Sequence, residues 1–91
     1  MLFIGLAKDK KTPTKEAVAK GTRMIEELKK QGINILSFYW TLGRYSAVIV
    51  FEAPSEKEAM KLAFDVLDDA SFETLVAIPR EKARKLLYGE E

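Results

Sequence analysis

A dense run of aromatic residues between two apolar segments most constrains how this chain can fold. Four of the nine aromatic residues and one glycine lie in the segment Phe38-Tyr39-Trp40-Thr41-Leu42-Gly43-Arg44-Tyr45. β-Branched and aromatic residues on both sides are typical of strands, and Gly43 allows the positive φ that a tight turn needs. The pattern predicts a β-hairpin whose strands span residues 33–42 and 45–53.

The segments before this hairpin predict a strand and then a helix. Residues 2–8 form a short apolar run that favours a first strand. Between residues 14 and 31, apolar residues recur at helical spacing. We expect Thr12 to cap this helix with Pro13 at its first position, and Gly32 to follow its end. Because Gly21 lies on the apolar stripe, we expect a neighbouring backbone to approach it closely. The stripe comprises Val18, Gly21, Ile25 and Leu28.

The segments after the hairpin repeat this order. Ser55 and Glu58 form a capping-box pattern for a second helix, which ends near residues 68–69. Residues 71–78 predict a fourth strand, and residues 80–88 a short terminal helix after Pro79. The order predicts a single α+β domain over residues 1–91, with the ferredoxin-like βαββαβ plan, a four-stranded antiparallel sheet and a short C-terminal helix.

Two helices can cover only one face of such a sheet, so the residues of the other face matter. Strict alternation places Leu36, Phe38, Trp40 and Leu42 on one side of residues 33–42, and Ile33, Ile35, Ser37, Tyr39 and Thr41 on the other. Both sides of residues 45–53 are also apolar at their centre. An uncovered apolar sheet face predicts a partner surface. We expect a homodimer or higher oligomer that packs sheet to sheet; alternatively, the terminal helix folds back over this face.

Composition excludes several classes of function. The chain has 15 basic and 14 acidic residues, so its net charge of +1 does not favour nucleic acid or an anionic membrane. It lacks Cys and His, which removes thiol nucleophiles, imidazole bases and the usual transition-metal sites. No apolar run is long enough to span a bilayer, and no signal peptide is evident. We expect a cytoplasmic protein without metal or cofactor; its many Lys and Glu residues fit a thermophilic source.

The hairpin segment, followed by an apolar strand and Glu52-Ala53-Pro54, resembles the GYD-domain family, which is named for a Gly-x-Tyr-Asp core. Here the core reads Gly43-Arg44-Tyr45-Ser46, so serine replaces the aspartate. The resemblance runs from the first strand to about Ile78, includes Glu73-Thr74-Leu75, and leaves the terminal helix outside. The family is similar to the dimeric α/β barrels, in which two ferredoxin-like sheets enclose a central space. That relationship implies a dimer but selects no chemistry.

The candidate site residues lie around the hairpin turn. Tyr39, Thr41 and Tyr45 could present hydroxyl groups to a ligand, Arg44 could bind an anionic group, and Trp40 could form an aromatic wall. Alternatively, these side chains serve packing and interface contacts. We expect Gly43 to serve the turn geometry.

Carboxylates elsewhere in the chain were also considered. Glu52, at the end of a strand, is either a buried base or an exposed residue. Asp65, Asp68 and Asp69 lie on a helix without a ligand loop and are not expected to bind metal.

Two hypotheses for function follow. In the first, the protein is a cytosolic oligomeric module that binds a small organic ligand or a partner between facing sheets. In the second, it is a cofactor-independent enzyme, similar to the monooxygenases or isomerases among the related barrels, and its catalytic residues are unknown. An RNA-recognition role is disfavoured, because Ser46 and Val48 occupy the positions of the two stacking aromatics of that motif.

Overall fold

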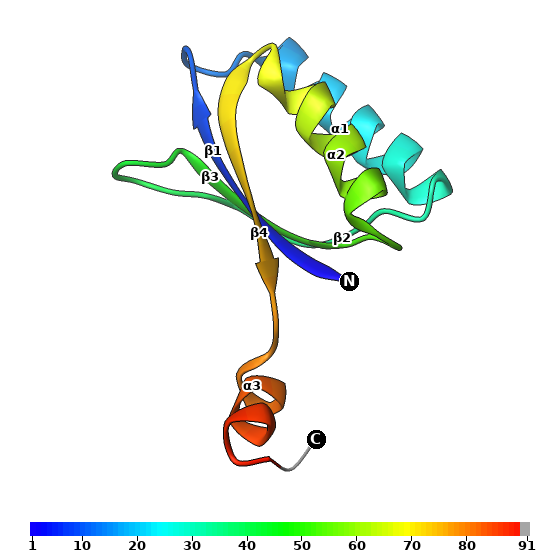
Figure 1. Cartoon of the computed structure of the whole chain (residues 1–91). Helices are drawn as coiled ribbons and strands as arrows, with labels where there is room; N and C mark the ends of the chain where they lie inside the picture. The colour runs from blue at the N-terminus through cyan, green and yellow to red at the C-terminus, as the bar shows by residue number, and fades with distance from the viewer. Residues whose placement is uncertain (90–91) are drawn as a thin grey trace.

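The chain forms a four-stranded antiparallel sheet with two helices on one face and a third helix beyond the sheet (Figure 1). The computed structural model describes residues 1–89. The strand order is β2-β3-β1-β4, which is consistent with the predicted ferredoxin-like plan. The elements are β1 (Leu2–Asp9), α1 (Lys15–Lys30), β2 (Asn34–Trp40), β3 (Ala47–Glu52), α2 (Glu56–Leu67), β4 (Ala70–Ala77) and α3 (Arg80–Leu87).

The hydrophobic core lies between the sheet and the helices, at the end of the sheet where β1 begins. Phe3 of β1 and Phe51 of β3 stack with their ring centroids 5.3 Å apart. Leu28 of α1 and Leu62 of α2 pack against them, and all four side chains are buried. Burial of large side chains at this end stabilises the contact of both helices with the sheet.

A β-bulge in β2 changes the faces that strict alternation predicts. Ile35 pairs with Phe51 and Ser37 pairs with Val50, so an extra residue, Leu36, lies between them. Consequently Ile35 faces the helices together with Phe38, and the prediction that it shares a face with Ser37 is wrong. A bulge inserts one residue into one strand only, which sequence alternation cannot reveal.

The face of the sheet opposite the helices, hereafter the open face, is apolar at its centre. The strand register sets out three rows across it, in the order β4, β1, β3, β2. The first row is Glu73, Leu6, Val48 and Tyr39; the second is Leu75, Ile4, Val50 and Ser37; the third is Ala77, Leu2, Glu52 and Asn34. Polar residues therefore lie at the ends of a surface whose middle is aliphatic.

Helix α1 begins at Lys15, because Thr14 rather than Thr12 is its N-cap. The Thr14 side-chain oxygen accepts a hydrogen bond from the Ala17 amide at 3.1 Å, which satisfies one of the free amides of the first turn. Gly32 follows the C-cap with φ of +85°, as expected for a helix end. The prediction for Gly21 is wrong, since a Cβ added there would meet no atom within 4 Å.

Helix α1 contacts the sheet closely only near its C-terminal end. Leu28 is its one buried residue, whereas Val18, on the same apolar stripe, is 48% exposed. The N-terminal half of α1 therefore leaves a space above the sheet, and this space is described below.

Helix α2 begins with the predicted capping box. The Ser55 hydroxyl accepts a hydrogen bond from the Lys57 amide at 3.2 Å and donates one to the Glu58 carboxylate. Both contacts favour the first turn of the helix.

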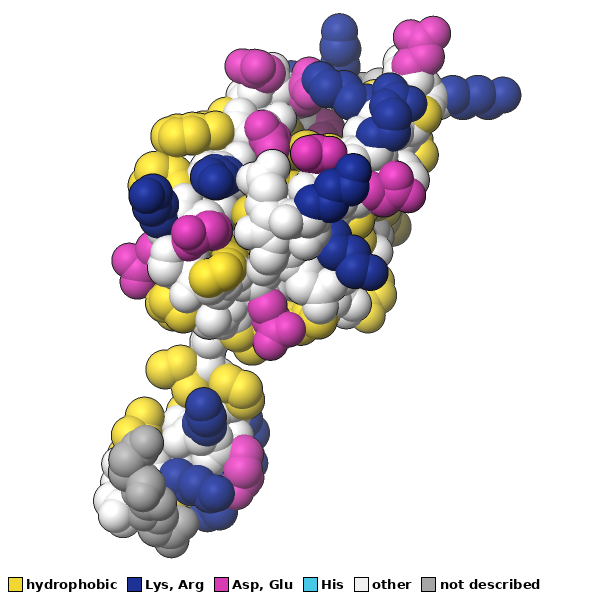
Figure 2. Space-filling model, turned by 90° about the vertical axis from the view of Figure 1, so that its right-hand side faces the viewer, with side chains coloured by type: hydrophobic (Ala, Val, Ile, Leu, Met, Phe, Trp, Pro, Cys, Tyr) yellow, Lys and Arg dark blue, Asp and Glu magenta, His cyan; other side chains and the backbone are white. Residues whose placement is uncertain are grey.

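Helix α3 lies away from the rest of the chain, joined to β4 by a short extended segment (Figure 1). Of the two alternatives for the terminal helix, folding back over the open face is not what the structure shows. Leu86 and Leu87 are exposed, and in Figure 2 apolar side chains gather where the α3 lobe joins the body. The radius of gyration is 14.5 Å, compared with about 12 Å for a compact chain of this length.

Candidate functional site

The loop between β2 and β3 positions most of the candidate residues. It is closed by a hydrogen bond from the Thr41 amide to the Ser46 carbonyl oxygen at 2.9 Å. The Thr41 hydroxyl donates a second bond to the Tyr45 carbonyl oxygen at 2.8 Å. Gly43 has φ of +105°, a conformation that an L-residue rarely adopts. The Thr41 hydroxyl and Gly43 therefore both contribute to the shape of the turn.

The loop does not bring all the candidate side chains together. Tyr39 pairs with Val48 and lies on the open face, whereas Trp40 pairs with Ala47 and lies on the helix side. Arg44 and Tyr45 extend toward β1 and β4 instead. The aromatic segment is thus divided between the two faces, because successive residues of a strand point in opposite directions.

Tyr45 makes the most specific side-chain contact in this region. Its hydroxyl donates a hydrogen bond to the Glu73 carboxylate of β4, and the Arg44 guanidinium lies 5.6 Å from the centroid of its ring. The hydrogen bond to Glu73 raises the pKa of Tyr45, with desolvation and the negative charge of Glu73 acting in the same direction and Arg44 opposing them. At neutral pH Tyr45 is therefore a hydrogen-bond donor and not a base.

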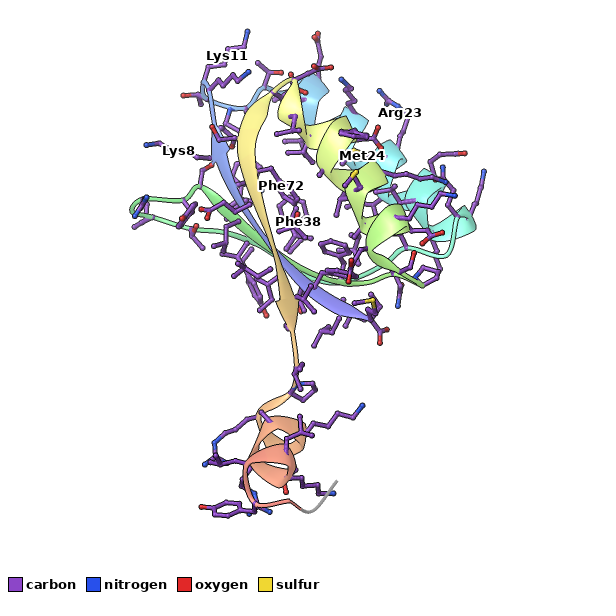
Figure 3. The ribbon with its side chains drawn as sticks, in the orientation of Figure 1. Lys8, Lys11, Arg23, Met24, Phe38 and Phe72 are labelled. Atoms are coloured by element: carbon purple, nitrogen blue, oxygen red, sulfur yellow. The ribbon has the colours of Figure 1, made fainter. Side chains whose placement is uncertain are left out.

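A shallow cavity of about 230 Å³ adjoins this contact. Hereafter it is the loop-side pocket. Its lining combines two cationic side chains with a phenol and a carboxylate, so it offers hydrogen-bond donors to an anionic group. Figure 3 shows the Lys8 side chain pointing away from the helices. The lining residues are Leu6, Lys8, Arg44, Tyr45, Ser71, Phe72 and Glu73.

Sequence reasoning did not assign Lys8 or Glu73 to a site. Glu73 is the only charged residue within β4, and a lone charge in a strand is a signal that could have singled it out. Its proximity to Tyr45 is not visible in the sequence, because the two residues are 28 positions apart and meet only through the strand order.

Ser46 has a structural role at the position where the family core carries aspartate. Its hydroxyl oxygen accepts a hydrogen bond from the Asp9 amide at 2.7 Å and donates one to the Ala7 carbonyl oxygen at 3.2 Å. The Ser46 amide also bonds to the Ala7 carbonyl oxygen, at 2.8 Å. Ser46 therefore fastens the loop to the end of β1.

The largest cavity of the described residues is a crevice of about 700 Å³ between α1, α2 and the sheet. We call it the helix-side crevice. Its floor includes Ala47 and Ile49 of β3, and Phe38 and Trp40 of β2 line it beside them. Figure 3 shows Phe38 and Phe72 in the space between the sheet and the helices. Helices α1 and α2 complete the lining with Ala17, Val18, Gly21, Met24, Ile25 and Val66.

The other carboxylates show no site. Glu52 is exposed, so it is not a buried base. Within residues 1–89 no group of three or more acidic side chains could hold a metal ion. Over the same residues, no helix combines the length and apolarity required to span a membrane.

Comparison with known proteins identifies the family. No curated protein and no solved structure shows significant similarity to the chain. The family model described as the GYD domain matches residues 3–87. The match covers nearly the whole chain and extends beyond Ile78 to the end of α3, so the expectation that the terminal helix lies outside the resemblance is wrong. With the Gly43-Arg44-Tyr45-Ser46 turn between β2 and β3, and a family match that includes all three helices, the chain belongs to the GYD-domain family.

Proposed function

We propose that the protein is a self-associating ligand-binding module. Two copies pack open face to open face, in the manner of the dimeric α/β barrels. A small organic molecule with an anionic group binds at the loop-side pocket, at the margin of the paired sheets. The observation that carries the proposal is the open face itself, which has an aliphatic centre and polar residues at its ends.

The distribution of residues on the open face suits a protein interface. Leu6, Ile4, Val48 and Val50 come from the two central strands and are only partly exposed. Tyr39 and Leu75 extend the apolar surface onto the two edge strands and are 59% and 46% exposed. Interfaces have apolar, often aromatic centres and polar margins. A second copy covers such a face by the same contacts from both sides.

The exposed surface of the single chain is also larger than that of a compact monomer. It amounts to 6838 Å², whereas a folded monomer of 10.3 kDa exposes about 5,400 Å². The difference of about 1,400 Å² exceeds the roughly 800 Å² that each partner buries in a standard interface. The chain therefore has enough excess surface for a stable dimer.

The chemistry of the loop-side pocket indicates the class of ligand. Lys8 and Arg44 favour an anion, and the Tyr45 hydroxyl and ring add a donor and an apolar surface. Tyr39 lies in the same row of the open face as Glu73, so a ligand bound between two copies can contact it. No observation favours the enzymatic alternative, because Tyr45 is held in its protonated form.

Sedimentation velocity tests the dimer. We expect the wild type to sediment as a dimer or a multiple of it at micromolar concentration, and Val50→Lys to sediment as a monomer, since a charge at the centre of the interface is costly. Phe64→Lys is the matched control, because Phe64 is 64% exposed on α2 and lies outside the sheet. A second variant, Leu75→Lys, changes a more exposed position in case Val50→Lys does not fold. A wild type that remains monomeric contradicts the proposal.

Titration with benzoate followed by NMR tests the ligand site. We expect the backbone amide signals of Arg44 and Tyr45 to shift, and Arg44→Gln to abolish the shifts because the cation is lost. Arg23→Gln, on α1, serves as the control for net charge. Unchanged shifts in Arg44→Gln would exclude the loop-side pocket as the binding site.

A further inference from the structure

We infer that the helix-side crevice is a second binding site, which takes a small, uncharged, largely apolar molecule with an aromatic ring or a branched hydrocarbon group. This site lies inside each copy of the chain, on the side of the sheet opposite the open face. It therefore does not depend on the proposed dimer or on the loop-side pocket.

The size and lining of the crevice match those of small-molecule sites. Its volume of about 700 Å³ lies within the range of roughly 300–1,000 Å³ found for ligand pockets, which are mainly apolar and aromatic inside. Phe38 and Trp40 provide two aromatic surfaces, and they are 42% and 63% exposed because no side chain of α1 covers them. A planar or branched apolar molecule would remove these rings from water.

The residues that face one another across the crevice explain why it stays open. On the floor, Ala7 of β1 pairs with Ala47 of β3. On the helix above, Ala17 and Gly21 present a methyl group and a hydrogen. At the other end of the same layer Phe3, Phe51 and Leu28 fill the space. The packing of the domain is therefore complete at one end only, and the cavity is the observation on which the site rests.

The position of the crevice excludes the chain's own terminal helix as its occupant. The crevice is lined by Asp9 and Ala70, which pair at the beginning of β4. Helix α3 follows the opposite end of β4, at Ala77. The seven steps between Ala70 and Ala77 correspond to about 23 Å along a strand, so α3 leaves the sheet far from the crevice.

Charges around the mouth favour a small molecule over a second protein chain. The rim carries Lys10, Lys20, Asp65, Asp68 and Asp69. Lys20 forms an ion pair with Asp69 at 3.8 Å, and the Lys10 amino group donates to the Asp68 carbonyl oxygen at 3.4 Å. Figure 2 shows positive and negative side chains interspersed over this side of the molecule. A protein partner would have to desolvate these groups, which interface centres avoid, whereas a small molecule can pass between them.

The same distribution of charge defines the ligand's polarity. The described side chains deep in the crevice are aliphatic, aromatic or a thioether, and these include Met24, Ile25, Ile49 and Val66. An ionic group buried among them would lose its hydration without a partner. The ligand is therefore neutral, with at most one polar end, which would lie at the mouth beside Thr14 and Asp9.

The experiment uses the neutral dye N-phenyl-1-naphthylamine and the fluorescence of Trp40, the single tryptophan of the chain. We expect saturable energy transfer from Trp40 to the dye, with one dye bound per chain. Gly21→Leu fills the crevice without a clash, since a Cβ at this position meets no atom within 4 Å. It should weaken dye binding by about tenfold or more. Ala17→Leu, one turn earlier, should act in the same direction and serves as a second variant if Gly21→Leu does not fold.

Two controls separate this site from the others. Ala19→Leu adds the same side chain to an exposed position of α1 outside the crevice, and it should leave dye affinity unchanged. Val50→Lys should also leave it unchanged, whatever its effect on the oligomeric state. Absence of saturable transfer in the wild type overturns the inference. So does wild-type affinity in both Gly21→Leu and Ala17→Leu, or loss of binding in Val50→Lys, which would place the dye between the sheets.

Discussion

The Tyr45 hydroxyl donates a hydrogen bond to the Glu73 carboxylate and thereby ties the β2–β3 loop to β4, the strand at the far edge of the sheet. Tyr45 precedes β3, and β1 lies between β3 and β4 in the sheet. The side chain therefore crosses the end of β1 and closes one end of the open face.

The first prediction concerns the ionisation of Tyr45. Because Glu73 raises its pKa, Tyr45 should titrate above the ordinary value for tyrosine, and Glu73→Gln should lower its pKa toward that value. Ultraviolet absorbance against pH measures the phenolate, and Tyr45→Phe assigns the transition. A raised folded-state pKa contributes stability that is present below about pH 10 and is lost as pH rises through the raised value. An unchanged titration in Glu73→Gln would show that the contact does not persist in solution.

The second prediction concerns the cap of α2. Ser55→Ala removes an acceptor for the Lys57 amide and the donor to Glu58, and should cost about 1 kcal/mol in the free energy of unfolding. Urea denaturation measures this change. Thr22→Ala, an exposed position in the middle of α1, is the control and should cost little. Equal effects of the two substitutions would contradict a capping role.

The same cap predicts a pH dependence. The Ser55 hydroxyl is the main cause of the lowered pKa of Glu58. A lowered folded-state pKa contributes stability above the ordinary glutamate value, and this stability is lost as pH falls through the lowered one. Wild type and Ser55→Ala should therefore differ less in stability in acid than at neutral pH. A difference that stays constant between pH 7 and the acid range would assign the effect to the Lys57 amide alone.

The third prediction compares two glycines. In Gly5→Ala the new methyl group would collide with the Phe72 ring, whose Cε1 lies 2.8 Å from the added Cβ. Overpacking of this kind should destabilise the protein by about 1–3 kcal/mol. Gly21→Ala, in a helix interior with free space around the position, should instead stabilise it by about 1 kcal/mol. Thermal unfolding of both variants checks the opposite signs, and a stabilising Gly5→Ala would mean that the Phe72 ring moves aside freely.

The fourth prediction concerns Ser46. Ser46→Ala leaves the Asp9 amide without its 2.7 Å acceptor, which should cost about 1 kcal/mol in the free energy of unfolding. It should also increase hydrogen exchange of the Asp9 amide, as NMR can measure. Ser71→Ala, an exposed position in β4 with a similar side chain, is the control. If the Asp9 amide exchanges equally in both variants, Ser46 does not fasten the loop.

Local sequence patterns predicted most of the elements, because each pattern reflects a contact between near neighbours. The Ser55–Glu58 box and Gly32 mark helix ends through bonds within one turn. Gly43 marks the hairpin through its own backbone conformation. Thr12 was the wrong cap because two threonines flank Pro13, and only the backbone path decides which of them accepts the Ala17 amide.

The candidate site was predicted only in part, for a related reason. The sequence indicated that the aromatic segment matters, but the bulge at Leu36 determines the register of β2, and Phe38 and Trp40 face the helices, away from Tyr39. Tyr45 was a candidate from its position in the turn, whereas Glu73 enters the site only because β4 pairs with β1.

The sequence by itself determined the order of strands and helices and the apolar character of both sheet faces, because these depend on side-chain periodicity and on turns of a few residues. Only the tertiary structure decided that α1 covers the sheet at one end, that a crevice remains above Ala47, and that α3 lies apart. The physical reason is that packing depends on which side chains meet across layers. Small residues distant in sequence, such as Ala7 and Gly21, leave a space only when the fold brings them face to face.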